Sequence, residues 1–318
     1  MVEILPLLFG GLVLFIYAIS KLSEAMQDIS TQRAKSIISK YTSNLFMAIG
    51  IGTILTILLG SSSAVIILAI VFINAGTLGF KQAIGIIMGA NIGTTFSSQL
   101  IALDIGQYAV VPLFIGLVME FFAKNKRIKS YGNALFYFGM LFFGLFIIEQ
   151  SVQPLKYSPM FEEWITRIEN NHIQGTLIGG LITLLVQSSS ATVGMAIVLG
   201  KQNLISLAGG LAIMLGSELG TCSDTLLATI KGSRQALKAG LFHLLFNFTT
   251  IVIGLIVFDL FLEFILWISK GQDLDNQIAN AHMLFNIAGV VVFLPFVGIT
   301  EKLLNKWLPD KDYELVKP

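Results

Sequence analysis

The sequence predicts an all-α polytopic membrane protein, and three observations support that class. The chain of 318 residues is 55% hydrophobic and only 12% charged, whereas soluble domains carry about 25% charged residues. Its mean hydropathy is +0.81. Apolar runs are long, as in helical spans, and do not alternate as in barrel strands. The net charge of +1 gives no reason to expect a nucleic-acid partner.

Several apolar runs approach the length of a membrane helix, which needs about 20 residues to cross the hydrocarbon core. They lie at 3–20, 82–103, 109–123, 132–149, 204–230, 236–258 and 279–299. The first run has no basic leader and no small-residue cleavage pattern, so we expect a membrane helix rather than a signal peptide. The polar segments 21–44 and 152–174 are predicted to be interfacial amphipathic helices.

Two further apolar regions are interrupted by serine triplets. LGSSSA at 59–64 divides the region 45–73, and VQSSSA at 186–191 divides the region 175–200. Each arm has about 14 residues, which is too short for a comfortable span. We therefore predict two re-entrant hairpins, a shape tolerated where the turn lines a polar cavity. The alternative for any single serine is ordinary packing inside a membrane helix.

The basic residues fit one orientation of these elements. With the N-terminus outside, the basic segments 21–44, 124–129 and 231–238 all fall on the cytoplasmic side, as the positive-inside rule requires. The acidic segments 150–174 and 259–278 then form outer loops. The sequence predicts a multi-pass protein of the cell membrane with a cytoplasmic C-terminal tail at 301–318.

The chain contains an internal repeat. A shift of 127 residues aligns 52–95 with 179–222, so that the serine triplets coincide and GANIGTT (89–95) meets GSELGTC (216–222). We predict repeats at 1–130 and 131–300, each with one hairpin and one helix broken at this second motif, at 82–103 and at 204–230. Three crossings separate the hairpins, so the repeats are predicted to have inverted topology, as in many secondary transporters.

The predicted breaks have a definite chemistry. A helix that starts at a break presents free N–H groups and a partial positive charge, which suit an anion. Serine hydroxyls add neutral donors. Freed carbonyl and hydroxyl oxygens suit a hard cation such as sodium. We call the two hairpin turns that hold the serine triplets, at 60–63 and 187–190, the serine tips. We expect the two serine tips to meet near the middle of the membrane and to form one site for both ions.

The motifs resemble the type II sodium–phosphate cotransporters, in particular their bacterial relatives. The resemblance covers about residues 1–300 and is carried by GSSSA (60–64), QSSSA (187–191), GANIGTT with its echo, and the pair HLLFN (243–247) and HMLFN (282–286). Some bacterial relatives continue into a soluble domain like the phosphate regulator PhoU, which these 318 residues do not contain.

The resemblance implies a secondary active transporter, not an enzyme, that takes up inorganic phosphate with sodium by alternating access. Sodium is the coupling ion, no cofactor or structural metal is expected, and the oligomeric state stays open. The implied phosphate-binding residues are Ser61, Ser62, Ser63, Gln187, Ser188, Ser189, Ser190, Asn91 and Thr94. The expected sodium-binding residues are Thr95, Glu218, Thr221 and Asp224.

Two departures from the family pattern keep alternatives open. Gly60 stands where the family usually has Gln, and Glu218 stands where it usually has Asn. A carboxylate inside a membrane is a functional candidate, so Glu218 or Asp224 allows proton coupling or another small oxyanion. A channel or an intramembrane serine hydrolase fits less well, because the hairpins suit a gated carrier and no base lies near either triplet.

The two HxLFN motifs point to helix packing. Each places His and Asn four residues apart, at His243 and Asn247 and at His282 and Asn286, which puts both side chains on one helix face. We expect hydrogen bonds there that join helices or line a cavity, with substrate contact as the alternative, and no zinc site.

Overall fold

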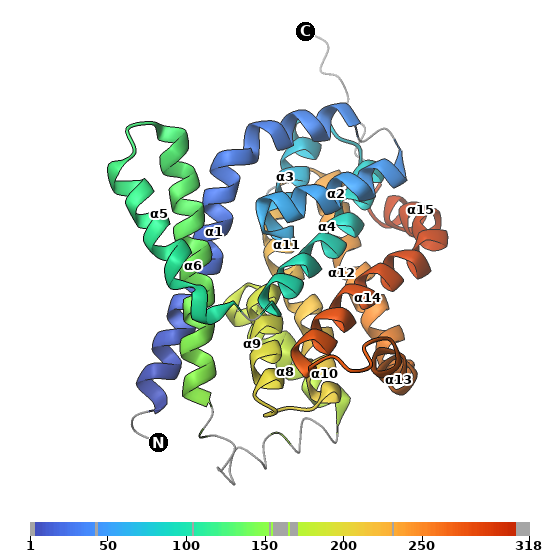
Figure 1. Ribbon diagram of the computed structural model, residues 1–318. Coiled ribbons are helices and arrows are strands. Elements are labelled where there is room, and N and C mark those ends of the chain that lie inside the picture. Colours follow the sequence, from blue (N-terminus) through green and yellow to red (C-terminus); the bar gives the residue numbers. More distant parts are fainter. Residues whose placement is uncertain are drawn as a thin grey trace.

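The structure is all-helical, and no strand occurs in the residues it describes, which are 4–41, 44–103, 105–152, 154, 165, 171–230 and 232–309. It is a computed structural model. α1 (Ile4–Tyr41) rises beside α6 (Lys126–Val152) and then bends across the top of the molecule (Figure 1). The predicted interfacial helix at 21–44 is therefore not a separate element, because α1 continues through it to Tyr41.

Five segments of the described chain are long and apolar enough to cross a membrane. They are Leu5–Ile29 of α1, α4 (Phe80–Ile101), α6, α12 (Arg234–Ile256) and the run Leu274–Trp307, which joins α14 (Leu274–Phe293), η3 (Leu294–Phe296) and α15 (Val297–Trp307). α4 has 22 residues and is about 33 Å long, close to the thickness of the hydrocarbon core. The predicted fold class is confirmed.

Two predicted elements differ from the structure. The span expected at 109–123 is the short helix α5 (Val110–Phe122), preceded by the 3-10 helix η1 (Gly106–Tyr108). Its 13 residues cover only about 20 Å. The loop expected at 259–278 holds the helix α13 (Phe258–Ile268), because apolar residues fill the intervals between its acidic ones. The second predicted interfacial helix, at 152–174, lies largely outside the described residues.

Each serine-containing region forms a pair of helices. α2 (Leu45–Leu59) and α3 (Ser62–Asn74) form the first pair, and α8 (His172–Val186) and α9 (Ser189–Lys201) form the second, with every boundary 127 positions later. α2 and α8 have 15 residues each, too few to cross a membrane alone. In Figure 1 the first pair occupies the upper half of the molecule and the second the lower half.

An asparagine at the equivalent position caps the first helix of each pair. Asn44 accepts a hydrogen bond from the Met47 N–H at 2.8 Å, and Asn171 accepts one from the Gln174 N–H at 3.1 Å. Asparagine is a preferred N-cap because its side-chain oxygen satisfies a free N–H of the first turn. These caps extend the 127-residue correspondence beyond the segment that aligns in sequence. The orientation of each pair relative to the membrane stays a prediction.

The predicted break in α4 is wrong, and close packing explains its glycines. α4 runs without interruption through 89–95. A Cβ atom on Gly89 would lie 1.9 Å from the Ile49 carbonyl oxygen, so this glycine lets α4 touch the backbone of α2. Gly216 does the same against Thr176 of α8, where a Cβ atom would lie 1.8 Å from the carbonyl oxygen. The motif therefore serves helix contact in both halves.

The second predicted break, within 204–230, corresponds to an interruption at the single residue Thr221, whose backbone keeps right-handed helical angles. α10 (Leu207–Gly220) ends where α4 would continue, and α11 (Cys222–Thr229) begins after Thr221. α10 packs on α8 as α4 packs on α2. The two halves thus share their packing and differ in whether the long helix is interrupted.

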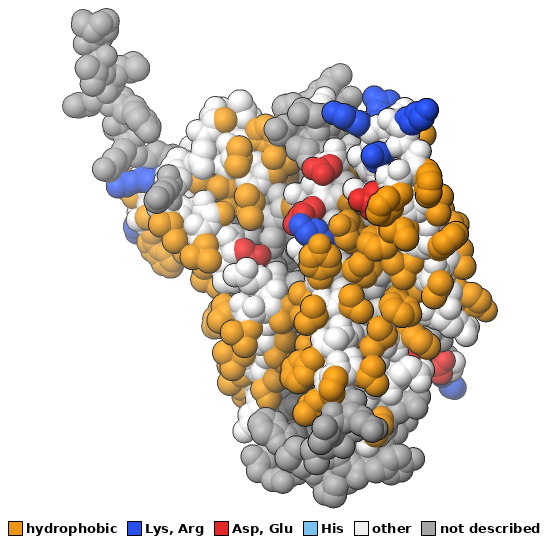
Figure 2. Space-filling view, turned by 90° about the vertical axis from the view of Figure 1, so that its left-hand side faces the viewer, with side chains coloured by type: hydrophobic (Ala, Val, Ile, Leu, Met, Phe, Trp, Pro, Cys, Tyr) orange, Lys and Arg blue, Asp and Glu red, His pale blue; other side chains and the backbone are white. Residues whose placement is uncertain are grey.

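The surface is that of a protein in contact with lipid. Apolar side chains cover most of the face that carries α1, α5 and α6 (Figure 2). Many large hydrophobic residues on these helices are exposed, including Leu5, Phe9, Val13, Phe114, Phe121 and Phe122. Exposed apolar surface of this extent indicates burial in a membrane or an interface.

Candidate binding site between the serine tips

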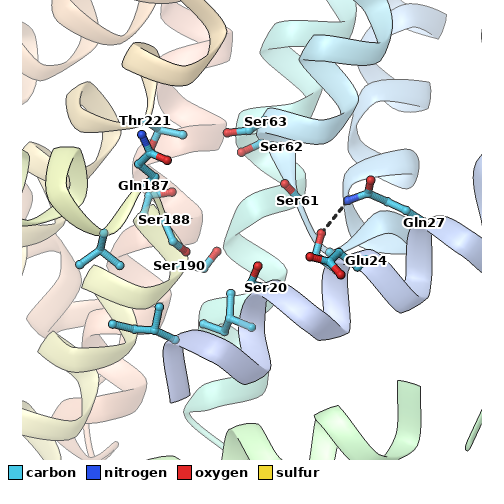
Figure 3. A pocket seen from close by; sticks show the side chains of 16 residues that line it. Ser20, Glu24, Gln27, Ser61, Ser62, Ser63, Gln187, Ser188, Ser190 and Thr221 are labelled. Atoms are coloured by element: carbon cyan, nitrogen blue, oxygen red, sulfur yellow. Dashed lines mark hydrogen bonds between the residues drawn. The ribbon is translucent and has the colours of Figure 1, made fainter. Parts of the chain in front are cut away.

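The two serine triplets line one cavity. Its volume is about 350 Å³, and it lies where the tip of the first helix pair faces the tip of the second (Figure 3). The lining residues are Ile16, Ile19, Ser20, Ser23, Glu24, Gln27, Gly60, Ser61, Ser62, Ser63, Val186, Gln187, Ser188, Ser189, Ser190 and Thr221. Eight of the predicted site residues are therefore brought together, namely both triplets, Gln187 and Thr221.

Both tips have the same backbone geometry. Gly60 and Gln187 close the first helix of each pair in the left-handed region, with φ of 64° and 56°. Ser61 and Ser188 then cap the second helix, each accepting a hydrogen bond of 3.2 Å from the N–H three residues on. Because these cap oxygens act as acceptors, both hydroxyl protons remain free to be donated into the cavity.

The left-handed turn gives the departure at Gly60 a physical reason. Glycine adopts this conformation without strain, whereas a residue with a Cβ pays about 1 kcal/mol or more. Gln187 keeps that strained conformation and places an amide in the cavity (Figure 3). Strain at a binding surface indicates a functional side chain, so the two tips differ in chemistry while they share a shape.

α1 supplies a third wall that the motifs did not reveal. Ser20, Ser23, Glu24 and Gln27 all line the cavity. Ser23 donates to the Leu59 carbonyl at 3.1 Å and accepts from the Gln27 amide at 2.9 Å, which ties α1 to the end of α2. The spacing of three and four residues puts these polar groups on one helix face, and that was the signal available in the sequence.

Asp224 lies directly behind the first tip. The Ser63 hydroxyl donates to Asp224 Oδ2 at 2.7 Å, and the Ser223 hydroxyl lies 3.3 Å from Asp224 Oδ1. Asp224 is half-buried at the start of α11. The predicted cation ligand Asp224 is thus coupled to the predicted phosphate ligand Ser63.

The remaining predicted residues do not line the cavity. Asn91, Thr94, Thr95 and Glu218 are buried between helices. Thr94 and Thr95 donate to carbonyls of their own helix, at Ala90 and Ile92. The hydroxyl protons of Thr94 and Thr95 are therefore bonded within α4. The assignment of these residues as phosphate or sodium ligands stays a prediction.

A buried polar network joins Asn91 and Glu218 to the HxLFN motifs. His282 bridges Ser98 and Glu218, with contacts of 2.6 Å at Nδ1 and 2.7 Å at Nε2, and Asn286 donates to the same Glu218 oxygen at 3.0 Å. At the other HxLFN motif, His243 contacts Thr225 at 2.8 Å, and the Asn91 amide donates to Asn247. The expected hydrogen bonds between helices are confirmed.

The comparisons with known proteins identify the family. The profile of the Na+/Pi-cotransporter family matches residues 14–150 and again residues 147–300. The chain belongs to the Na+/Pi-cotransporter family. Because one profile matches two successive stretches, this result agrees with the predicted duplication, although the repeat boundaries at 130 and 131 stay predictions.

Individual relatives cover the chain to different extents. It is 26% identical over 304 residues to the uncharacterized protein YqeW of Bacillus subtilis (strain 168), which covers 95% of this chain and 98% of YqeW. It is 23% identical over 290 residues to the putative inorganic phosphate export protein YjbB of Escherichia coli (strain K12), covering 91% of this chain but 53% of YjbB. The chain therefore spans about half the length of YjbB.

A shorter match reaches an animal protein. The chain is 35% identical over 101 residues to the Homo sapiens sodium-dependent phosphate transport protein 2B, which is 31% of this chain and 15% of that protein. No solved structure matches the chain.

For this member of the Na+/Pi-cotransporter family, the cavity has the chemistry of an anion site without a cationic side chain. α3 and α9 both begin at its wall, so first-turn N–H groups and two positive helix ends face it. Among the described residues that line it, no Lys or Arg is present, and the charged one is Glu24, whose carboxylate pairs with Lys21. The arrangement therefore offers a ligand helix dipoles and hydroxyl groups in place of a cationic side chain.

Proposed function

We propose that this protein is a secondary active transporter that carries inorganic phosphate together with sodium by alternating access. The observation that carries the proposal is the single cavity lined by both serine triplets. Two helix pairs of equal geometry that approach one site from the two ends of the molecule are suited to closing it alternately. No organic cofactor takes part in this scheme.

Phosphate is the anion we propose for the cavity. Ser62, Ser63, Ser189 and Ser190 occupy the first turns of α3 and α9, where N–H groups have no intrahelical acceptor. A tetrahedral oxyanion offers several acceptor oxygens, so donors converging from two sides match its shape. The family name and the printed names of YjbB and transport protein 2B support this choice.

Charge balance supports a coupled cation. Lys21 and Glu24 offset each other, and Asp224 adds a negative charge behind Ser63. A phosphate placed between these groups is stabilised when a cation enters with it, because uncompensated charge is costly in a low-dielectric site. Sodium takes oxygen ligands of the kind that hydroxyls, carbonyls and carboxylates supply. We propose Thr221 and Asp224 as its nearest ligands.

The direction of transport follows the ion gradients in this proposal. A symporter moves phosphate inward when sodium runs inward, whereas the YjbB relative is named a phosphate export protein. The test is labelled phosphate flux in proteoliposomes, measured inward and outward, with sodium, potassium or a proton gradient. We expect flux to require sodium on the side from which phosphate leaves.

Matched variants keep that test specific. Ser189→Ala removes a hydroxyl from the cavity. Thr300→Ala removes a hydroxyl of α15 that donates to the Phe296 carbonyl at the end of η3, away from the cavity. The proposal requires Ser189→Ala to lose flux and Thr300→Ala to retain it. Phosphate flux of equal size in sodium and in potassium would rule out sodium coupling.

A buried titratable pair favours proton coupling as the second candidate. Glu218 and His282 share a contact of 2.7 Å in the protein interior, where both are less than a tenth exposed. Such a pair is a typical carrier of an intramembrane proton. Glu218→Gln abolishes flux driven by a proton gradient under this candidate, and it leaves sodium-driven flux largely unchanged under the first.

A further inference from the structure

The two serine tips are backed by different chemistry. Asp224 stands 127 positions after Ser97, and Ser190 stands 127 positions after Ser63. In the first tip the Ser63 hydroxyl donates to the Asp224 carboxylate at 2.7 Å. In the second tip the corresponding pair is Ser190 and Ser97, which both line a neighbouring, mostly apolar cavity of about 220 Å³. One carboxylate therefore breaks the symmetry of the site.

This contact fixes the direction of one hydrogen bond. A hydroxyl has one proton to donate, and an ionised carboxylate only accepts. Once Ser63 gives its proton to Asp224, its oxygen offers only lone pairs to the cavity that it lines. In Figure 3 the Ser63 hydroxyl points toward the space between the two tips. Ser63 thus acts as an acceptor beside the Ser61 and Ser188 hydroxyls and the first-turn N–H groups of α3 and α9, which are free to donate.

We infer that Asp224, acting through Ser63, makes the cavity selective for a tetrahedral oxyanion that still carries a proton. This inference rests on the proposed function, because it names the determinant of selectivity at the same site. Phosphate and arsenate keep at least one proton near neutral pH and donate it to Ser63. Sulfate and selenate have the same shape but carry no proton near neutral pH. When one of them binds, the Ser63 oxygen receives no hydrogen bond and faces an oxygen of the anion, which is also an acceptor.

The physical effect is a penalty on the unprotonated anions. Two acceptors that face each other repel, and an unsatisfied buried polar group loses its hydration without compensation. Sites built to bond a particular hydrogen reject analogues that lack it much more strongly than sites built on shape alone. Asp224 is therefore a positioning residue, since it acts on the anion through the Ser63 hydroxyl.

The test compares four anions on the purified protein. Phosphate, arsenate, sulfate and selenate are titrated against labelled phosphate in an equilibrium binding assay at fixed sodium. We expect arsenate to compete about as well as phosphate, and sulfate and selenate to bind at least roughly tenfold more weakly.

Two substitutions at Asp224 then change whether residue 224 accepts the hydroxyl proton of Ser63. Asp224→Asn supplies an amide that donates to Ser63 and frees its proton, and Asp224→Ser copies the residue of the other tip. Both are expected to reduce the phosphate-to-sulfate preference by about tenfold. Asp259→Asn removes a carboxylate with an exposed side chain and serves as the charge-matched control.

The outcomes separate the inference from the proposed function. If the parent binds sulfate as tightly as phosphate, the inference is overturned. If Asp224→Asn leaves the phosphate-to-sulfate preference unchanged and only raises the sodium requirement, the inference is also overturned, because Asp224 then serves solely as the sodium ligand proposed above. If the parent binds none of the four anions, the proposed function itself fails.

Discussion

The two serine tips share one backbone geometry but carry different side chains. Both tips have a left-handed residue, a serine N-cap and a second helix of 13 residues. They differ at Gly60 against Gln187 and at Asp224 against Ser97. The comparison teaches that the repeated frame builds the cavity, whereas the exchanged residues change the chemical groups at its wall and are the ones we propose to set its ion selectivity.

The largest expected effect tests the shared frame. Gly52→Val and Gly179→Val each place side-chain atoms into the backbone of the facing helix, because a Cβ atom would lie 2.2 Å from the Ile86 oxygen or 2.1 Å from the Ile213 oxygen. We expect a loss of about 4 kcal/mol or more, seen as little folded protein in detergent. Gly50→Val in the same helix has open space around its Cβ and should fold normally.

A smaller but still large effect distinguishes the two buried histidines. His282→Ala leaves the Glu218 carboxylate without its histidine partner, whereas His243→Ala removes a contact with the neutral Thr225. Removing one partner of a buried pair costs about 3–5 kcal/mol, against about 1–3 kcal/mol for a neutral hydrogen bond. In detergent, the unfolding temperature of His282→Ala should therefore be lower than that of His243→Ala. The reverse order would mean that Glu218 carries no charge in need of a partner.

The next prediction concerns the hydroxyls of both tips. Ser62→Ala and Ser189→Ala each remove one hydroxyl from the cavity proposed to bind the anion, so each should weaken phosphate binding by about tenfold. The double variant should not lose more than the two single effects multiplied. Binding that depends on only one of the two serines would contradict a site shared by both tips.

The smallest effect tests the strained glutamine. Gln187→Gly relieves about 1 kcal/mol of left-handed strain and removes the amide from the cavity. The unfolding temperature should stay the same or rise slightly, while phosphate binding weakens by about threefold. A variant that unfolds more easily and binds phosphate normally would show that Gln187 serves folding and not binding.

The sequence predicted the tips better than the helices around them. Rare serine triplets at one fixed offset identify equivalent positions, and short arms on either side limit them to hairpins. Continuous α4 was not predictable from GANIGTT, because glycine and asparagine also mark turns and only the facing backbone of α2 shows that Gly89 serves packing. The wall formed by Glu24 and Gln27 required knowing where α1 bends over the tips.

The central claim is that one oxyanion binds between the two tips. Crystals of the protein grown with sodium arsenate test it most directly, since arsenic gives an anomalous diffraction signal that locates the anion without reference to the chain. The account predicts one strong peak within hydrogen-bonding distance of both Ser62 or Ser63 and Ser189 or Ser190. A peak that contacts only one tip, or that lies elsewhere in the protein, would contradict it.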